Sequence, residues 1–358
     1  MANKQAKEFV VLGIESSCDE TSVAVLVVKN KQFFIKSNIV SSQIKIHAPF
    51  GGVVPEIAAR HHVQNFLPVL KEALAQAQYS PKKIDLIAVT SGPGLITSLL
   101  VGAQAAKTLS YAWQKPLIGV NHIKAHISAN FLQPVKFPAI ALIVSGGHTE
   151  LILVKSRQNF KKVGQTRDDA AGEAFDKVAK ILGLGYPGGP IVSEQALNGN
   201  RSAFNFPRPM LQDNNLDFSF SGLKTSVLYL VNKEPLSSQL VNGQSKNQLI
   251  ADLCASFQQA AVDVLVGKTI KAALKYRAKA VILAGGVAAN KSLRQQLGEA
   301  VAQKLTAQYL VPEFSLCTDN AAMIAIAGYE EYQKTSINKL KTTWQNLVVE
   351  ANWEIPSL

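Results

Sequence analysis

Two separate segments of the sequence share one pattern: an apolar strand, a turn of small residues and a second apolar strand. The first spans residues 9–28 (FVVLGIESSCDETSVAVLVV) and the second spans residues 139–154 (AIALIVSGGHTELILV). Short apolar runs joined by turn residues predict β-hairpins, and helical patterns follow each pair. A hairpin that is used twice in one chain predicts two related α/β lobes, which we expect to face each other across a cleft.

A third apolar run leads into a helix instead of a second strand. Residues 280–297 read AVILAGGVAANKSLRQQL, in which Asn290 or Ser292 could cap the helix. Further helices are expected at residues 56–78 and in DDAAGEAFDKVAKILGLG, because apolar residues recur there at helical spacing.

The length of the chain supports a division into two domains. A chain of 358 residues, 47% of them hydrophobic, is long enough to bury two cores rather than one. We expect an N-terminal lobe at residues 1–118 and a C-terminal lobe at residues 119–321. Residues 322–346 are expected to pack back on the N-terminal lobe.

Composition excludes several classes of protein. The longest apolar runs, such as residues 23–28 and 139–144, fall far short of the ~20 residues that a membrane span needs. The first residues resemble neither a secretory signal nor an Arg-rich transit peptide. Cys18, Cys254 and Cys317 are odd in number and widely spaced, which favours neither a disulfide framework nor a CxxC metal site. We expect a soluble, cytoplasmic protein with no membrane partner.

The net charge points to a polyanionic partner. The 37 Lys and Arg residues outnumber the 25 Asp and Glu residues, which gives a formal charge of +12. Such an excess favours nucleic acid through counterion release and electrostatic steering. The basic residues form several clusters, and each cluster alone would equally suit a solvated helix face. Because the excess extends over the whole chain, nucleic acid remains the favoured partner.

The stretch GVNHIKAHI, residues 119–127, places His122 and His126 four residues apart. On a helix both imidazoles project from one face and can bind one ion, although they could also pack or hydrogen-bond separately. A metallopeptidase of the HExxH type needs a glutamate beside the first histidine, and Ile123 occupies that position. Asp319, in LCTDNAAMIAIAG, is the favoured third ligand, but it could instead cap the alanine-rich helix that follows.

Glycine-rich turns form the second candidate site. SGGHT, AGGVAAN, YPGGP and GIESSCDET each join the end of a strand or helix to another element. Glycine lets the backbone approach a phosphate, and a helix that begins at such a turn adds its partial positive charge. Tight turns alone would explain each case separately. Their number in one chain favours a nucleotide site.

These strings resemble the TsaD branch of the actin, Hsp70 and sugar-kinase superfamily. That branch comprises the tRNA adenosine threonylcarbamoyltransferases, once described as O-sialoglycoprotein endopeptidases. The resemblance covers nearly the whole chain, from about residue 10 to about residue 330. The matching strings, in order, are GIESSCDETSVAV, GGVVPEIAARHH, TSGPGL, NHIKAH, LIVSGGHTEL, DDAAGEAFDKVAKILGLGYPGGP, FSFSGLKT, LAGGVAANKSLR and CTDNAAMIA.

The resemblance implies a fold and a set of site residues. The fold would be α/β, with two actin-like lobes of the ribonuclease H-like (ASKHA) type around a central nucleotide cleft. The metal ligands of the family, the histidines of HxxxH and the aspartate of TDN, fall on His122, His126 and Asp319. Many relatives carry an acidic residue where this chain has Ser193, so we assign no ribose contact there. The implied adenylate-binding positions are Ile143, Val144, Ser145, Gly146, Gly147, Asp176, Gly189 and Asn290.

The implied reaction moves the threonylcarbamoyl group of threonylcarbamoyl-AMP to N6 of adenosine 37. The acceptor lies in the anticodon loop of tRNAs that read codons beginning with A. The first loop reads Gly13-Ile14-Glu15, whereas related kinases carry an Asp-x-Gly turn for phosphoryl transfer, which agrees with a different chemistry. Glu15, Asp19 and Glu20 are weak candidates for the catalytic base, since a solvated turn carboxylate is the more common role for such residues.

The resemblance also implies a cofactor and partners. We expect one divalent metal ion per subunit, with Fe²⁺ favoured over Zn²⁺, although the ligand set by itself suits both. Bacterial relatives work with a TsaB-like paralogue and a TsaE-like ATPase, and we expect such partners here. The alternatives are a metallopeptidase of the HxxxH type and a non-catalytic, actin-like nucleotide-binding scaffold.

Overall fold

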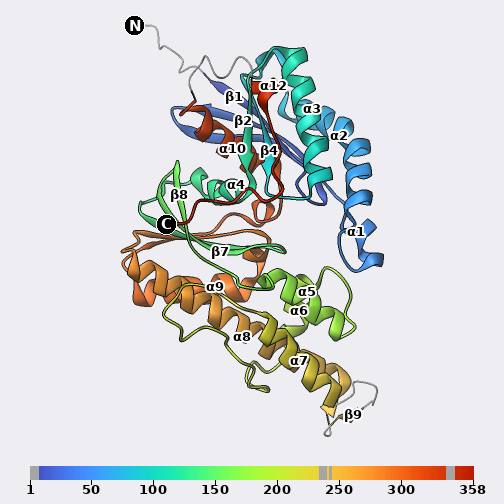
Figure 1. Cartoon of the computed structure of the whole chain (residues 1–358), viewed down its shortest axis with the longest axis vertical. Coiled ribbons are helices and arrows are strands. Elements are labelled where there is room, and N and C mark those ends of the chain that lie inside the picture. The colour runs from blue at the N-terminus through green and yellow to red at the C-terminus, as the bar shows by residue number, and fades with distance from the viewer. Residues whose placement is uncertain (1–7, 234–239, 242–243, 336–342) are drawn as a thin grey trace. The chain divides into compact units, whose positions relative to one another are not determined.

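The computed structural model of the chain describes residues 8–233, 240–241, 244–335 and 343–358. Its contacts divide the chain into two compact units, each of which appears in Figure 1 as a sheet covered by helices. The first unit comprises residues 1–134 and 312–355. The second comprises residues 135–311 and 356–358.

The first unit is built on a five-stranded sheet. Its strands are β1 (Phe9–Glu15), β2 (Glu20–Lys29), β3 (Gln32–Ser42), β4 (Leu86–Gly92) and β5 (Leu117–Asn121). They lie in the order β3-β2-β1-β4-β5. The predicted hairpin is confirmed, because β1 and β2 pair antiparallel, while β4 and β5 are added in parallel.

The second unit repeats this plan. Its strands are β6 (Ala139–Val144), β7 (Thr149–Ser156), β8 (Asn159–Gln165), β11 (Ala280–Ala284) and β12 (Gln308–Leu310). They lie in the order β12-β11-β6-β7-β8, with an antiparallel hairpin of β6 and β7 and parallel strands β11 and β12. A separate two-stranded ladder joins β9 (Leu240–Val241) and β10 (Gln244–Ser245). The prediction of two related α/β lobes is confirmed.

Helices cover both faces of the first sheet. Leu12 and Ile14 of β1 belong to a buried cluster with residues of α2 and α3, including Phe66. Gly13 lies between them and faces the other side, as the alternation of a strand requires. A Cβ atom at Gly13 would lie 2.1 Å from the carbonyl oxygen of Ala321, so glycine is needed for α10 to pack this closely. The helices are α1 (Ile44–His47), α2 (Pro55–Ala77), α3 (Ile96–Trp113), α4 (His122–Ser128), α10 (Ala321–Tyr332) and α12 (Thr343–Asn346).

The second unit holds the longest helix. Its helices are α5 (Ala171–Ile181), α6 (Gly188–Gln195), α7 (Ser221–Lys233), α8 (Lys246–Lys275) and α9 (Lys291–Lys304). Within the described ranges, α8 alone is long and apolar enough to cross a membrane by length and composition. However, 83% of its most apolar window is buried inside the protein, which is the burial of a core helix.

The first unit extends further along the chain than the predicted N-terminal lobe of residues 1–118. The strand β5 pairs with β4 of the first sheet, and α4, which follows it directly, packs on α10. Residues 119–134 therefore lie in the first unit, and the chain returns to that unit at Pro312 instead of Ala322. All three predicted metal ligands are consequently held by one unit.

Candidate functional site

The two histidines lie on the short helix α4, at the end of strand β5. The side chain of Asn121, the last residue of β5, accepts a hydrogen bond of 3.1 Å from the backbone N–H of Lys124 and so caps this helix. His122 and His126 follow one turn apart, and both side chains are buried. Their rings lie edge to face with centroids 4.6 Å apart. The helical spacing predicted from sequence is confirmed.

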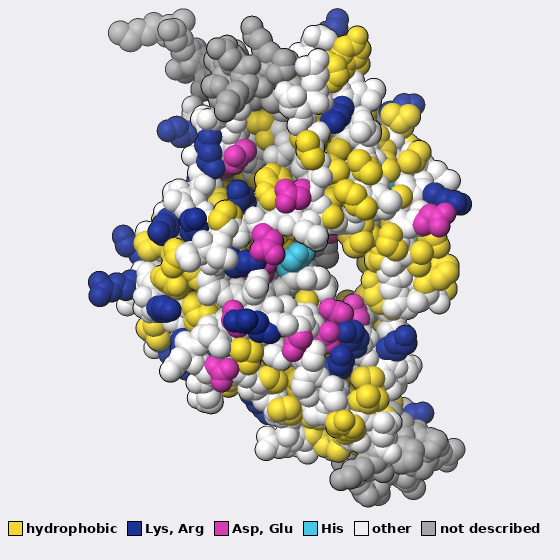
Figure 2. Space-filling view, viewed as in Figure 1, with side chains coloured by type: hydrophobic (Ala, Val, Ile, Leu, Met, Phe, Trp, Pro, Cys, Tyr) yellow, Lys and Arg dark blue, Asp and Glu magenta, His cyan; other side chains and the backbone are white. Residues whose placement is uncertain are grey.

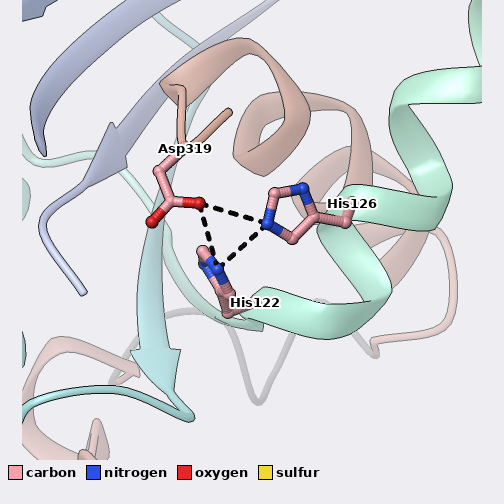
Figure 3. Close-up of side chains that lie close together, drawn as sticks. All are labelled: His122, His126 and Asp319. Carbon is pink, nitrogen blue, oxygen red and sulfur yellow. Dashed lines mark hydrogen bonds and ion pairs between the residues drawn. The ribbon is translucent and has the colours of Figure 1, made fainter. Parts of the chain in front are cut away.

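The third group comes from the segment that leads into α10. Asn320, not Asp319, caps this helix, because its side chain accepts a hydrogen bond of 3.1 Å from the backbone N–H of Met323. The carboxylate of Asp319 is thus left to face the histidines, with Oδ1 lying 3.4 Å from Nε2 of His122 and 3.2 Å from Nε2 of His126 (Figure 3). The alternative that Asp319 serves as the helix cap is wrong.

The spacing of these atoms fits a shared metal ion. Nε2 of His122 lies 3.1 Å from Nε2 of His126, so the three ligand atoms are separated by 3.1, 3.2 and 3.4 Å. Ligand atoms about 2.1 Å from one ion lie about 3.0 Å apart at octahedral angles and about 3.4 Å apart at tetrahedral angles. Among the described residues, no other group of three or more histidine, cysteine or carboxylate side chains has its ligand atoms within 4.8 Å of one another.

The charges of His122 and Asp319 stabilise each other. Burial by itself would lower the pKa of His122, but Asp319 and Glu15 raise that pKa well above its ordinary value. Burial lowers the pKa of His126. Burial opposes the charge of Asp319, yet the two histidines hold the pKa of its carboxyl well below the usual range. Without a metal, a proton on His122 therefore balances the Asp319 carboxylate, and metal binding must displace that proton.

Glu15 orients His122 through Nδ1, the ring nitrogen that does not face Asp319. Its side chain is fully buried, and Oε2 lies 3.0 Å from Nδ1 of His122. The same oxygen accepts a hydrogen bond of 2.8 Å from the hydroxyl of Thr90, and Oε1 accepts one from the backbone N–H of Ser17. A carboxylate that accepts the Nδ1 proton keeps Nε2 free to bind a metal. Nδ1 of His126, by contrast, is buried with no hydrogen-bond partner among the described residues.

Of the other two candidate carboxylates, Asp19 is also buried, whereas Glu20 is half-buried. Asp19 is 9% exposed, and Glu20 accepts a hydrogen bond of 3.2 Å from the hydroxyl of Ser42. Burial, together with the charges of Asp319 and Asp19, raises the pKa of Glu20 well above its ordinary value. Solvated turn carboxylates are therefore the wrong description of Glu15 and Asp19.

The predicted adenylate-binding residues lie in the second unit, at the carboxyl ends of β6 and β11. Ile143 and Val144 end β6, and the turn that follows is closed by a hydrogen bond of 2.8 Å from the N–H of Ser145 to the carbonyl of His148. Cβ atoms added at Gly146 and Gly147 would meet no atom within 4 Å, so this turn leaves open space.

The helix α5 begins next to this turn, and α6 begins next to α5. Gly172, in the first turn of α5, packs on Ser145, since a Cβ atom there would lie 2.5 Å from the Ser145 carbonyl oxygen. Asp176 of α5 accepts a hydrogen bond of 2.7 Å from the N–H of Gly188, where α6 begins. Gly189 borders open space in the next position. Fixed N–H groups at helix starts suit a phosphate.

Asn290 connects the start of α9 to the second turn of α6. Its Oδ1 caps α9 by accepting from the N–H of Leu293, and its Nδ2 donates to the hydroxyl of Ser193 on α6 and to Oε1 of Gln258. The cap predicted at Asn290 or Ser292 is therefore Asn290. Ser193 is part of this network.

The fold and the first-unit cluster together define an actin-like α/β protein with a candidate metal centre of two histidines and one carboxylate. A family model described as TsaD, tRNA N6-adenosine threonylcarbamoyltransferase, matches residues 34–326. The chain belongs to this family of tRNA-modifying transferases, as the strings in its sequence suggested. The predicted enzyme class is confirmed.

Curated relatives agree over most of their length. A protein of Thermosipho africanus named tRNA N6-adenosine threonylcarbamoyltransferase is 54% identical over 327 residues, which cover 91% of this chain and 95% of that protein. A protein of the same name from Bacillus licheniformis is 52% identical over 331 residues, which cover 92% of this chain and 93% of that protein.

Solved structures show the fold alone. HypF of T. kodakarensis matches with a TM-score of 0.59 at 16% identity, covering 94% of this chain and 49% of that chain. Component A of the (R)-2-hydroxyglutaryl-CoA dehydratase of Acidaminococcus fermentans matches with a TM-score of 0.50 at 16% identity, covering 91% of this chain and 99% of that chain. These likenesses support the actin-like class of fold.

Proposed function

We propose that the chain transfers the threonylcarbamoyl group of threonylcarbamoyl-AMP to N6 of adenosine 37. The acceptor is a tRNA that reads codons beginning with A, and AMP is released. The observation that carries the proposal is the cluster of two buried histidines, His122 and His126, with the half-buried Asp319, in a chain of the TsaD family. These ligands come from two segments almost 200 residues apart and still converge within 3.4 Å of one another.

The reaction is an acyl transfer. The exocyclic amine of adenine attacks the carbamoyl carbon, and a C–N bond forms. The bond from this carbon to the phosphate oxygen breaks, AMP leaves with the electron pair, and the amine loses one proton to solvent. A splayed base in a single-stranded loop is accessible to such an attack, whereas a base within a duplex is not.

The open turn of the second unit is the proposed adenylate site. The backbone from Ile143 to Gly147 would approach the phosphate, because Gly146 and Gly147 leave the adjoining space empty. Asp176 holds the start of α6, where Gly189 offers a second approach. Asn290 caps α9 and donates a hydrogen bond to Ser193 of α6, so it holds these two helices together.

The metal would be held by His122, His126 and Asp319, one ion per subunit. A divalent ion there supplies a Lewis acid and a template for oxygen atoms of the substrate. We favour Fe²⁺ over Zn²⁺, although two imidazoles and a carboxylate suit both ions. The contribution of the chain itself is to fix the imidazoles, through Glu15 on one side and the Asn121 cap on the other.

The metallopeptidase alternative lacks a base at the required position. Ile123 stands where an HExxH enzyme carries its glutamate, and its side chain is buried with 3% exposure. The nearby carboxylate of Glu15 is bonded to Nδ1 of His122, on the side of the ring opposite the Nε2 that faces Asp319.

The reconstituted reaction tests the proposed function. The purified chain is supplied with tRNA, ATP, threonine, bicarbonate, an adenylate-forming enzyme, and a TsaB-like paralogue with a TsaE-like ATPase as the proposed partners. Mass spectrometry of the nucleosides is expected to show threonylcarbamoyladenosine. Absence of this product, in a mixture in which an established relative makes it, would refute the proposal. Omitting each partner in turn tests whether that partner is needed. We propose the cytoplasm as the compartment of the reaction.

A substitution in the open turn tests the adenylate site. Replacing Gly146 and Gly147 by alanine places methyl groups in space that the protein leaves empty, so the melting temperature is expected to stay within about 2 °C of wild type. AMP binding, measured by calorimetric titration, is expected to weaken at least ~10-fold because the backbone no longer approaches the phosphate.

The matched control is Gly172→Ala, whose added Cβ would collide with the Ser145 carbonyl. This variant is expected to lose stability as well as AMP binding. Unchanged AMP affinity in the Gly146→Ala, Gly147→Ala protein would exclude the turn as the phosphate site.

A further inference from the structure

Five exposed basic residues gather at one edge of the second-unit sheet. They come from three segments that precede parallel strands: the approach to β6, the connection from α8 to β11, and the end of α9 before β12. We call them the basic edge. Its members are Lys136, Lys275, Arg277, Lys279 and Lys304.

Backbone pairing brings these segments together. The N–H of Lys279 donates to the carbonyl of Pro138 at 2.7 Å, and the N–H of Gln308 donates to the carbonyl of Lys279 at 2.9 Å. The side chain of Gln308 in turn accepts from the N–H of Lys136 at 3.3 Å. Neighbouring strands lie about 4.8 Å apart, so three adjacent segments set the charges across roughly 10 Å.

No acidic residue balances this edge from its own segments. Residues 131–140, 271–285 and 300–311 contain neither Asp nor Glu. Within the part of the chain that the structure describes, none of the five side chains forms an ion pair with a carboxylate. At several places on the face in Figure 2, by contrast, lysines and arginines lie beside acidic side chains.

Helix termini explain only part of the cluster. Lys275 and Lys304 end α8 and α9, where a cation offsets the partial negative charge of the helix. Lys136, Arg277 and Lys279 lie outside any helix, so that explanation does not reach them. Like charges held this close repel each other unless a polyanion or salt screens them.

The basic edge lies at the opposite end of the strands from the glycine turns. Strand β6 runs from Ala139, beside the edge, to Val144, beside the SGG turn, and spans roughly 20 Å at 3.3 Å per residue. A nucleotide bound at the turn cannot touch the basic edge. An RNA whose reacting base lies near that turn can contact the basic edge only through another part of its backbone.

We propose that the basic edge binds tRNA phosphates outside the reacting nucleotide. The inference rests on the proposed function and adds a binding surface to it. Phosphate contacts of this kind position an RNA without reading its sequence. They also make its affinity depend on salt, because each contact releases condensed counterions.

The test compares tRNA binding at several salt concentrations. The variant Lys275→Gln, Arg277→Gln, Lys279→Gln removes three charges and keeps side chains of similar length. The slope of log K against log salt is expected to become shallower by about 2 to 3, and affinity at physiological salt to fall ~10–100-fold. Metal content and melting temperature are expected to match wild type, since the metal ligands lie in the other unit.

The charge-matched control is Lys31→Gln, Lys82→Gln, Lys83→Gln, which removes three exposed lysines from the first unit. It is expected to retain most of the tRNA affinity. An equal loss of tRNA affinity in both variants would show that only net charge matters, and would overturn the proposed binding surface. An unchanged salt slope in the Lys275→Gln, Arg277→Gln, Lys279→Gln variant would overturn it as well. Failure of wild type to modify tRNA would instead overturn the proposed function.

Discussion

Replacing both His122 and His126 by alanine is expected to remove the bound metal. Wild type should retain about one divalent ion per chain after gel filtration, and the variant less than ~0.1, because Asp319 alone cannot hold the ion. Threonylcarbamoyl transfer in the reconstituted system is expected to fall at least ~10³-fold. Metal is measured by plasma mass spectrometry and the modified nucleoside by chromatography.

A third histidine provides the matched control. His61 lies on α2 and is absent from the cluster of metal ligands, so His61→Ala should keep both the metal and the activity. Circular dichroism must show that the double variant is folded. Equal metal content in wild type and in the folded double variant would remove this site from the account.

Glu15→Gln is expected to weaken metal binding ~10–100-fold, although the side chain keeps its shape. The glutamate accepts the Nδ1 proton of His122 and so leaves Nε2 free to face Asp319. An amide nitrogen at that position donates instead, which favours the tautomer with its proton on Nε2 and blocks the metal.

The measurement is a competition titration against a chelator of known affinity, paired with nitrogen NMR shifts that report the tautomer of His122. Glu15→Asp keeps an acceptor and is expected to recover part of the affinity. The Thr90→Val protein loses only the hydroxyl that supports Glu15, so a smaller effect is expected there. Wild-type metal affinity in Glu15→Gln would show that the carboxylate does not orient the imidazole.

The sequence predicted the parts of this protein that depend on local patterns. Alternating and continuous apolar runs identified both hairpins, and the four-residue spacing of His122 and His126 identified their shared helix face. Matching strings also identified the family. Each of these features depends on residues that are near one another in the chain, where spacing translates directly into geometry.

The features that the sequence did not predict depend on tertiary packing. The sequence favoured Asp319 as the third ligand but left its role as a helix cap open, and the structure shows that Asn320 caps α10 instead. Burial of Glu15 follows from its position at the end of a central strand. The first unit continues to residue 134 instead of ending at residue 118, because β5 pairs with β4. This pairing joins segments that are far apart in sequence.

In this account His122, His126 and Asp319 together bind one divalent ion. A titration with Mn²⁺ followed by EPR tests this directly, since the sharp spectrum of the free ion is lost when the ion is bound by a protein. We expect the wild-type chain to bind about one Mn²⁺, and the folded His122→Ala, His126→Ala variant to bind none beyond the background. Equal binding of Mn²⁺ by the two proteins would contradict the account.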